Sequence, residues 1–238
     1  MNYKRIFKIT AGIIIFMTLP SLLLFGYVYF KYNEELPQGT KGEEAEVLAT
    51  KMLTALDHEA YESTNLIEWT FKKRHHYKWK KNDYKCTVYW EDYKVELNFK
   101  DENLHKAYIH NFKVDGEQAK ELIQKATDYF NNDSFWLVAP YKVFDEGTER
   151  RIVTLENGEQ GLLVTYTSGG STPGDSYLWL LDADYKPKAF KMWTSILPIQ
   201  GLEASWTDWT VTESQAQLPT FHKLLVLGIE LDDVTGKH

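Results

Sequence analysis

The sequence predicts an α+β fold in which a strongly curved antiparallel sheet, an incomplete β-barrel of about ten strands, wraps two helices and follows one N-terminal transmembrane helix. Three features lead to this prediction. One segment near the N-terminus lacks charged residues, two segments have apolar residues at helical spacing, and much of the remaining chain alternates between apolar and polar residues. Such alternation is typical of strands with one buried face, because successive side chains point to opposite sides.

Residues 9–30 contain no charged side chain and are long enough for one helical crossing of a bilayer, which takes roughly 20 apolar residues. Three basic residues precede this segment, and two acidic residues follow it closely. Because basic residues accumulate on the cytoplasmic side, we expect residues 1–31 to form a cytoplasmic tip and a transmembrane anchor. The alternative is a cleaved secretory signal, but the length of the segment, its aromatic end and the lack of a small-x-small cleavage site favour an anchor.

The rest of the chain is then extracytoplasmic, and periplasmic if the cell is Gram-negative. Residues 32–42 are polar and are predicted to form a linker to a ligand-binding domain of residues 43–238. Residues 1–31 hold four of the 27 basic and none of the 34 acidic residues, so the remainder has a net charge of −11. An acidic domain without a basic stripe is a poor nucleic-acid binder, and we expect no such partner. The single cysteine, Cys86, is expected to be a small buried side chain.

The first helix of the domain is predicted to begin near Glu43, with Thr40 at capping-box spacing. Its apolar stripe consists of Ala45, Leu48, Ala49, Met52, Leu53 and Leu56. His58 and Glu59 follow it, but the position where a zinc peptidase has its second histidine is Glu62, and no downstream motif supplies a third protein ligand. We therefore expect the solvated end of a helix and no metal site.

The longest alternating stretch runs from Asn65 to Phe99 and predicts an antiparallel meander, which residues 106–110 extend. Asn82-Asp83 and Glu91-Asp92 separate its strands at hairpin spacing. Its apolar face is rich in aromatic residues, so either protein or a ligand must cover it.

A second helix is predicted from Asp115 to Phe130 and is expected to end at Asn131-Asn132-Asp133. The second half of the chain is then read as strands, with a tight hairpin at Asn157-Gly158. The expected strands are 135–139, 151–155, 162–167, 176–181, 189–193, 202–211 and 224–227.

The sequence contains no recognisable catalytic motif. Gly-x-Ser-x-Gly is absent, and Ser168–Ser176, which is rich in glycine and hydroxyl groups, lies between two predicted strands and is expected to be a hairpin loop. If a loop is functional, we expect it to be this one. His75 and His76 are adjacent on a strand and face opposite sides. We predict no enzymatic activity, no catalytic residue, no cofactor and no metal.

The aromatic residues favour ligand binding, because a curved sheet closed over helices by large rigid rings encloses irregular apolar space. The side chains predicted to line this space are Ile67, Trp69, Phe71, Trp79, Val88, Trp90, Val95, Leu97, Trp136 and Trp179.

The order of these elements, the motif Asn-Asn-Asp-Ser-Phe-Trp-Leu at 131–137 and the motif Tyr-Leu-Trp-Leu-Leu-Asp at 177–182 resemble the LolA-like group of outer-membrane lipoprotein-sorting proteins, over roughly residues 43–215. The resemblance implies an unclosed β-barrel with helices as a lid over an apolar cavity for acyl chains, without enzymatic activity. The predicted membrane helix departs from the soluble carriers, which have a cleaved signal. It favours a tethered acceptor, donor or lipid-handling relative.

We therefore expect a membrane-anchored extracytoplasmic binding protein for an apolar ligand, either a lipid or a lipoprotein acyl chain, with an envelope protein as a further partner. Two alternatives remain open. One is an envelope scaffold or assembly partner whose own side chains fill the core, and the other is a hydrolase whose site has no sequence signature.

Overall fold

The computed structural model describes residues 3–169 and 172–238. Its helices are α1 (Tyr3–Tyr32), α2 (Glu43–Ala55), α3 (His58–Ser63) and α4 (Gly116–Val138), with short 3-10 turns η1 (Glu102–Leu104) and η2 (Ala139–Lys142). Its strands are β1 (Leu66–Phe71), β2 (His75–Lys80), β3 (Lys85–Trp90), β4 (Tyr93–Asn98), β5 (Lys106–Ile109), β6 (Phe112–Val114), β7 (Thr148–Thr154), β8 (Gln160–Tyr166), β9 (Ser176–Leu181), β10 (Pro187–Trp193), β11 (Leu202–Ser205), β12 (Asp208–Val211), β13 (Gln217–Leu224) and β14 (Leu227–Lys237).

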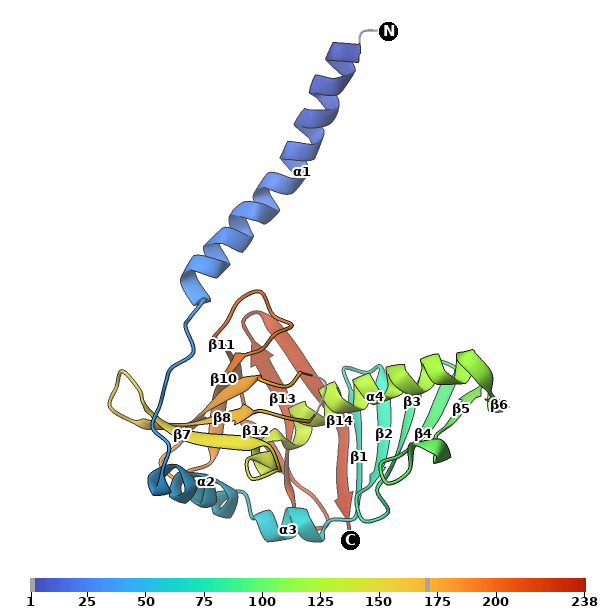
Figure 1. Ribbon diagram of the computed structural model, residues 1–238, viewed down its shortest axis with the longest axis vertical. Coiled ribbons are helices and arrows are strands. Elements are labelled where there is room, and N and C mark those ends of the chain that lie inside the picture. The colour runs from blue at the N-terminus through green and yellow to red at the C-terminus, as the bar shows by residue number, and fades with distance from the viewer. Residues whose placement is uncertain (1–2, 170–171) are drawn as a thin grey trace.

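Within the described residues, the strands form one fourteen-stranded sheet (Figure 1). Neighbouring strands follow the order β6-β5-β4-β3-β2-β1-β14-β13-β11-β10-β9-β8-β7, and β12 pairs with β13 beside this path. The two end strands, β6 and β7, are joined through α4 and do not pair with each other, so the sheet stays open. The predicted α+β class and the curved, unclosed antiparallel sheet are confirmed, whereas the expected count of about ten strands is too low.

The meander of β1 to β4 agrees with the sequence pattern. Buried and partly exposed residues alternate along β1 and β3, and the turns between β2 and β3 and between β3 and β4 fall at the predicted hairpin positions. Cys86 lies on the buried face with 1% of its surface exposed, as predicted. The alternation of apolar and polar residues therefore determines which face of these strands forms the core.

The last strand, β14, joins the two halves of the sheet. Its end pairs with β1 through Leu66 and Lys237, and its start pairs with β13 through Leu224 and Leu227. The predicted strand 224–227 is therefore wrong, because this apolar run spans the turn between two strands. The charged residues that follow belong to β14 and were not recognised as a strand.

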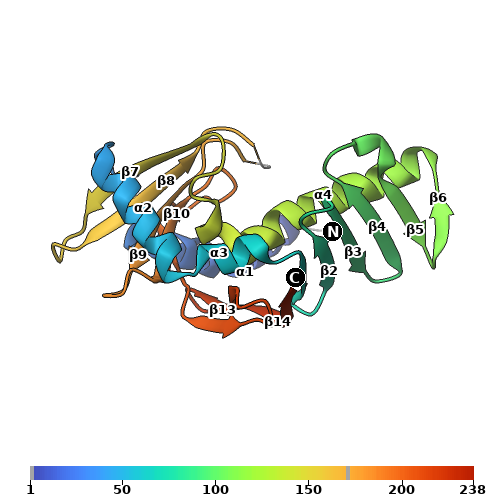
Figure 2. The ribbon, with the colours of Figure 1, turned by 90° about the horizontal axis from the view of Figure 1, so that it is seen from below.

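Helix α4 is longer than predicted and crosses the concave side of the sheet (Figure 2). It contacts β4 and β5 at one end of the sheet and β13 near its centre. The expected helix end at residues 131–133 and the expected strand 135–139 are both wrong. Asp133 is buried and bonded to side chains of β2, and these tertiary contacts outweigh the low helix propensity of Asn and Asp. Residues 135–138 are apolar on every face of the helix, as expected where the sheet covers a helix on more than one side.

Three smaller corrections concern segment ends. Thr40 does not cap α2, whose N-cap is Gly42, but forms an isolated bridge with Ile152. Asp57, in the left-handed region with φ of 51°, separates α2 from α3, so the first predicted helix is in fact two. The predicted strand 202–211 is divided into β11 and β12. Of the candidate loop 168–176, residues 170–171 lie outside the described residues.

Helix α1 stands away from the sheet (Figure 1). Its segment Ile6–Tyr32 contains an 18-residue stretch with a mean hydropathy of 2.1 and is long and apolar enough to cross a membrane, a property that a signal sequence shares. The remaining helices, α2 to α4, lie against the sheet, and their apolar stripes enter one continuous core.

Candidate ligand-binding site

The ten residues predicted to line a cavity lie on β1 to β4, α4 and β9. Eight are buried, namely Ile67, Trp69, Phe71, Val88, Trp90, Val95, Leu97 and Trp179, whereas Trp79 and Trp136 are partly buried. The structure brings them into two aromatic groups rather than one. The first group lies between β1–β4 and α4, and the second surrounds Phe190 of β10, which contacts both Trp136 and Trp179.

Side chains of α4 fill the space over the first group. The ring of Phe130 lies 6.4 Å from that of Trp69 and 5.4 Å from that of Trp79. Tyr129, the neighbouring residue, meets Trp90 edge to face at 5.7 Å. The concave face is therefore covered by protein in this arrangement, with Phe130 at the centre of the contact.

Trp79 is the member of the ten that reaches an open depression. A pocket of about 390 Å³, here called the mouth pocket, is lined by Glu62, Trp79, Lys81, Asn82, Tyr84 and Phe99. It lies between the end of α3, the β2–β3 turn and the end of β4. Its volume falls within the range of roughly 300–1,000 Å³ that small-molecule sites occupy.

A continuous series of aromatic rings connects the mouth pocket with the core. Phe99, which is 42% exposed, packs on Phe130 with ring centres 4.9 Å apart. Phe130 contacts Trp79, and Trp79 contacts Trp69, which is fully buried, at 6.4 Å. The rings therefore form an apolar path from the surface to the space beneath α4.

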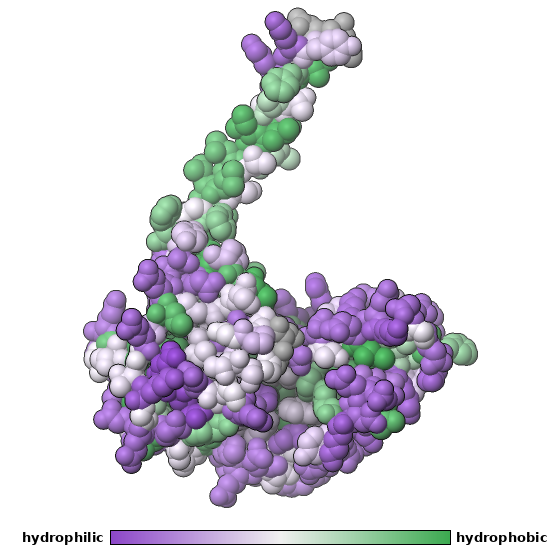
Figure 3. Space-filling view, viewed as in Figure 1, coloured by the Kyte–Doolittle hydropathy of each residue, from purple (hydrophilic) through white to green (hydrophobic). Residues whose placement is uncertain are grey.

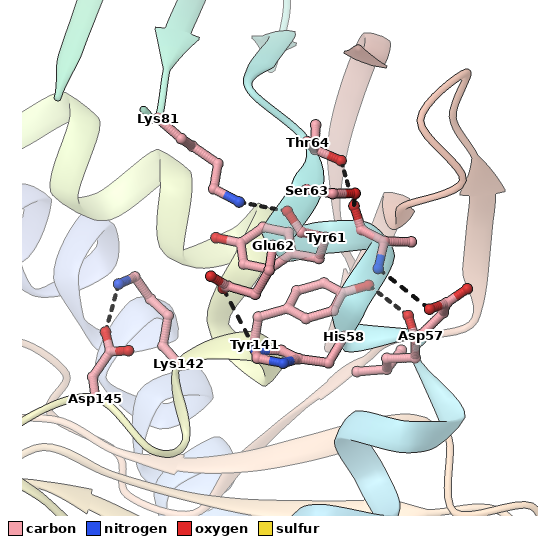
Figure 4. Close-up of polar contacts among 12 residues, drawn as sticks. Asp57, His58, Tyr61, Glu62, Ser63, Thr64, Lys81, Tyr141, Lys142 and Asp145 are labelled. Atoms are coloured by element: carbon pink, nitrogen blue, oxygen red, sulfur yellow. Dashed lines mark hydrogen bonds and ion pairs between the residues drawn. The ribbon is translucent and has the colours of Figure 1, made fainter. Parts of the chain in front are cut away.

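Lys81 supplies a cation at the rim of the pocket (Figure 4). Its Nζ donates a hydrogen bond to the backbone oxygen of Tyr61 and lies 3.7 Å from the centre of the Tyr61 ring. Burial lowers the pKa of Lys81 to about 8, and the nearby Glu62 carboxylate partly opposes this shift. At neutral pH the amine is still mostly charged, with incomplete hydration, which suits it to pair with an anionic group.

Rigid aromatic stacking holds α3 and Lys81 in place. The rings of Tyr61 and Tyr141 stack 4.0 Å apart, and the His58 ring lies beside this pair, 6.3 Å from Tyr61 and 6.2 Å from Tyr141 (Figure 4). The Tyr141 hydroxyl lies 2.6 Å from the carbonyl oxygen of Gln217 on β13. The stack thus ties α3 to the middle of the sheet and positions one wall of the mouth pocket.

A buried polar cluster fastens α4 to β2. The Asp133 carboxylate, with 2% of its surface exposed, accepts hydrogen bonds from the Tyr77 hydroxyl at 2.6 Å and from Nδ1 of His75 at 2.7 Å. Burial and then the Asp133 charge raise the pKa of Tyr77, so this hydroxyl remains a donor. His75 also stacks on Tyr129 at 3.8 Å. Among the described serine, threonine and cysteine side chains, none is hydrogen-bonded to His75, so the cluster contains no nucleophile next to its histidine.

Metal binding finds no support in the geometry. Nowhere in residues 3–169 or 172–238 do three His, Cys, Asp or Glu side chains gather closely enough to hold an ion. Nε2 of His58 and the carboxylate of Glu62, which the sequence places one helical turn apart, lie 3.5 Å from each other on the surface. A second depression of about 320 Å³ lies on that side of α3, lined by Thr50, Leu53, Thr54, Asp57, His58, Glu59 and Phe144.

Several residues of the mouth pocket were not predicted as site residues. Lys81, between Lys80 and Asn82, has the pattern of a solvated turn, and nothing in the sequence indicates that its amine folds back over Tyr61. Phe99 was assigned to the apolar face of a strand, but it follows the end of β4 and is exposed. It has the same parity as Leu97, which predicts burial, and nothing in the sequence indicates that the strand ends before it.

Comparison with known proteins gives little further information. No family model matches the chain, and no curated protein sequence matches it. Among solved structures, the chain is similar to a crystal structure of a DUF1329 family protein from Desulfovibrio piger ATCC 29098, with a TM-score of 0.41 and 8% sequence identity. The alignment covers 81% of this chain and 93% of that chain.

Proposed function

We propose that the protein is a membrane-tethered extracytoplasmic binding protein for an apolar ligand, a lipid or a lipoprotein acyl chain, and that it has no enzymatic activity. The observation that carries the proposal is the path of rings from the mouth pocket through Phe130 to Trp69. An acyl chain that leaves water to pack against these rings gains about 0.8 kcal/mol for each buried CH₂ group.

The ligand would bind in two parts. Trp79, Tyr84 and Phe99 offer apolar walls to the end of the chain that lies in the mouth pocket, and the Lys81 amine pairs with an acidic head group. A longer chain reaches the predicted lining residues only if Phe130 and its helix move away from the sheet. Ligand binding is thus coupled to a displacement of α4.

Unpaired donors under α4 also support a ligand in this region. Among the described side chains of this region, the indole N–H groups of Trp69 and Trp90 are buried and lack a hydrogen-bond partner. A buried unpaired donor costs about 1–3 kcal/mol. The carbonyl oxygens of a lipid ester would supply acceptors that the protein itself does not.

A second candidate function is an envelope scaffold with a filled core. The observation in its favour is that eight of the ten predicted lining residues are buried against protein. In this case the mouth pocket is a surface depression, and the aromatic path serves only to stabilise the fold.

Lipid analysis and ligand uptake distinguish the two functions. The full chain, kept in nanodiscs, is extracted with organic solvent for mass spectrometry and is titrated with a fluorescent fatty acid, with empty nanodiscs as the background. Phe99→Asp places a charge on the path and should weaken saturable uptake about tenfold, or ~1.4 kcal/mol. Phe112→Asp, at a ring that is 77% exposed on β6, is the matched control and should bind like the wild type. Absence of both a stoichiometric lipid and saturable uptake would favour the scaffold.

A further inference from the structure

The edge of the sheet nearest α1 carries apolar side chains that the described residues leave exposed. Val226 is 93% exposed, Leu227 is 60% exposed, and Ile196 is 69% exposed. Figure 3 shows hydrophobic surface at the top of the domain, beside the foot of α1. Val226 lies in the β13–β14 turn, Leu227 is the first residue of β14, and Ile196 belongs to the loop between β10 and β11.

The topology places these two loops side by side. Strand β11 pairs with β10 on one side and with β13 on the other, so the end of β10, the start of β11 and the end of β13 share one edge of the sheet. Strand β14 also starts at this edge, where Leu227 pairs with Leu224. The exposed apolar side chains therefore form one group, here called the apolar tips, defined as Ile196, Val226 and Leu227.

The foot of α1 is docked at the same edge. The backbone N–H of Glu34 donates to the oxygen of Gln200, and the Gln200 N–H donates to the Asn33 side chain at 2.9 Å. The indole of Trp193 donates to the Glu34 oxygen, and Lys191 forms an ion pair with the Glu34 carboxylate at 2.7 Å. Residues 33 and 34 are thus part of the domain surface and not of a free spacer.

Close packing limits how far this joint can bend. A side chain at position 201 would lie 2.7 Å from the Glu34 Cβ, so only Gly201 allows the two segments to approach. Val28 and Tyr32 of α1 pack against the domain core. The direction of α1 therefore sets the orientation of the domain, and the apolar tips lie level with the end of the membrane-spanning segment (Figure 1).

The composition of the β13–β14 turn is unusual for a solvated hairpin. A two-residue turn favours Asn, Asp or Gly, but this turn consists of Leu225 and Val226. Leu225 adopts a φ of 53°, which is unfavourable for a residue with a Cβ. Exposed leucine and valine in such a turn give no advantage in water, whereas they bind well at the boundary between head groups and acyl chains.

We propose that the apolar tips insert into the outer interface of the membrane that α1 crosses and hold the domain in a fixed orientation on it. The inference rests on the tether of the proposed function and does not depend on the ligand. The partner is the lipid surface, because the tips lie at the same edge of the sheet as the docked foot of the membrane-spanning helix.

Depth measurement by spin labelling tests this inference. The full chain is reconstituted in phosphatidylcholine vesicles with a nitroxide at Val226→Cys, at Ile15→Cys in α1 or at Asp83→Cys in the β2–β3 turn. Native Cys86, with 1% of its surface exposed, is shielded from the labelling reagent, and labelling of the wild type verifies this. The label at 226 should be several-fold more accessible to oxygen, and several-fold less accessible to a water-soluble nickel chelate, than the label at 83.

The labels at positions 226, 15 and 83 distinguish a failure of the inference from a failure of the proposed tether. A label at 226 that behaves like the label at 83, while the label at 15 is in the bilayer, overturns the inference and leaves the tether intact. If the label at 15 is also in water, both the tether and the inference are wrong. Strong dipolar broadening between labels at 226 indicates a second copy as the partner and likewise overturns the inference.

A charge substitution gives an independent readout. Val226→Asp should make a nitroxide at Ile196→Cys several-fold more accessible to the water-soluble nickel chelate. Val211→Asp, at a valine that is 62% exposed near the opposite edge, is the matched control and should leave the label at 196 unchanged. Equal effects of the two substitutions, or no effect of Val226→Asp, would contradict insertion of the tips.

Discussion

At the residue scale, His222 shows how burial determines a protonation state. Its side chain is fully buried, and its two ring nitrogens lie 2.8 Å from the Ser205 oxygen and 2.7 Å from the Trp136 oxygen. Both carbonyls favour the charged ring, but burial outweighs them and lowers the pKa of His222 to about 4. The neutral ring carries a single N–H, so it donates a hydrogen bond to only one of these two carbonyl oxygens, on β11 or on α4.

This shift predicts a loss of stability in mild acid. The unfolded chain binds a proton near pH 6.5, whereas the folded chain does so only near pH 4, so stability falls as the pH decreases through this window. Between pH 7 and pH 5 we expect His222 to account for a decrease of about 2 kcal/mol in the free energy of unfolding. Urea denaturation at the two pH values measures it.

The control is His222→Gln, which does not titrate. The variant is expected to be less stable at pH 7, because it loses one of two buried contacts, but the decrease between pH 7 and pH 5 should be smaller than in the wild type by about 2 kcal/mol. An equal decrease in both proteins would mean that His222 is charged in the folded state.

Lys81 leads to a second prediction, on ligand binding. The free amine loses its proton as the pH rises through about 8, so the affinity for a fatty acid carboxylate should fall above this pH. The rim is partly solvated, and we expect the ion pair to contribute about 1 kcal/mol. Fatty acid titrations at pH 7 and pH 9.5 test this. Lys81→Met should bind more weakly at pH 7 and show no such decrease, and a fall of equal size in that variant would exclude Lys81 as the head-group partner.

At the scale of elements, α4 is held to the sheet by one polar cluster and by ring contacts. Asp133→Ala removes the acceptor of Tyr77 and His75 and leaves both donors buried, which should cost about 2–4 kcal/mol in the free energy of unfolding. Hydrogen exchange along residues 127–137 should accelerate more than exchange in β8 and β9. Asp128→Ala, at an exposed carboxylate on the same helix, should change stability by less than about 0.5 kcal/mol. Uniform acceleration across the sheet would show that α4 does not open separately.

The sequence predicts those elements whose signals are local. The apolar parity of Ile67, Trp69 and Phe71 specifies the buried face of β1, and turn residues mark the hairpins of the meander. The C-terminal part of α4 has no such signal, because residues 135–138 are covered on several sides and show no amphipathic period. The sequence around Asp133 is typical of a helix end. In the structure, Asp133 lies inside α4, because hydrogen bonds to its partners on β2 stabilise the helix at this position.

The candidate site was less predictable than the sheet. Of the ten residues expected to line a cavity, Trp79 lies in the mouth pocket. The prediction rested on the alternation of apolar residues along the strands. Alternation shows which side chains face the interior, but it does not show whether that interior is filled by protein or forms a cavity. Helix α4 determines that distinction, and its position on the concave side depends on contacts between residues far apart in the sequence. The cation at the rim depends on one backbone oxygen of α3, which no sequence pattern reveals.

At the scale of the whole molecule, the mouth pocket and the foot of α1 lie at opposite edges of the sheet. The β2–β3 turn beside the pocket bonds to Asn65, which in turn bonds to Lys237 at the end of β14, whereas β14 begins in the turn that carries the apolar tips. The strand has eleven residues with a bulge near Asp233, so its two ends lie at most about 36 Å apart. Under the proposed tether, a domain oriented by α1 presents the pocket away from the membrane that α1 crosses (Figure 1).

This arrangement predicts the route by which the ligand arrives. A ligand taken from the bilayer that holds α1 must cross up to about 36 Å of water or protein surface, whereas a donor in the extracytoplasmic space meets the pocket directly. In vesicles that contain the full chain, we expect a fluorescent fatty acid presented on albumin outside to reach the pocket faster than the same probe placed beforehand in the vesicle bilayer. The same measurement on Phe99→Asp gives the uptake that does not use the pocket, and this background is subtracted from the wild-type rate. Faster loading from the bilayer would show that the pocket lies close to the membrane surface. This result would contradict both the proposed orientation of the domain and the position of the binding site far from the membrane.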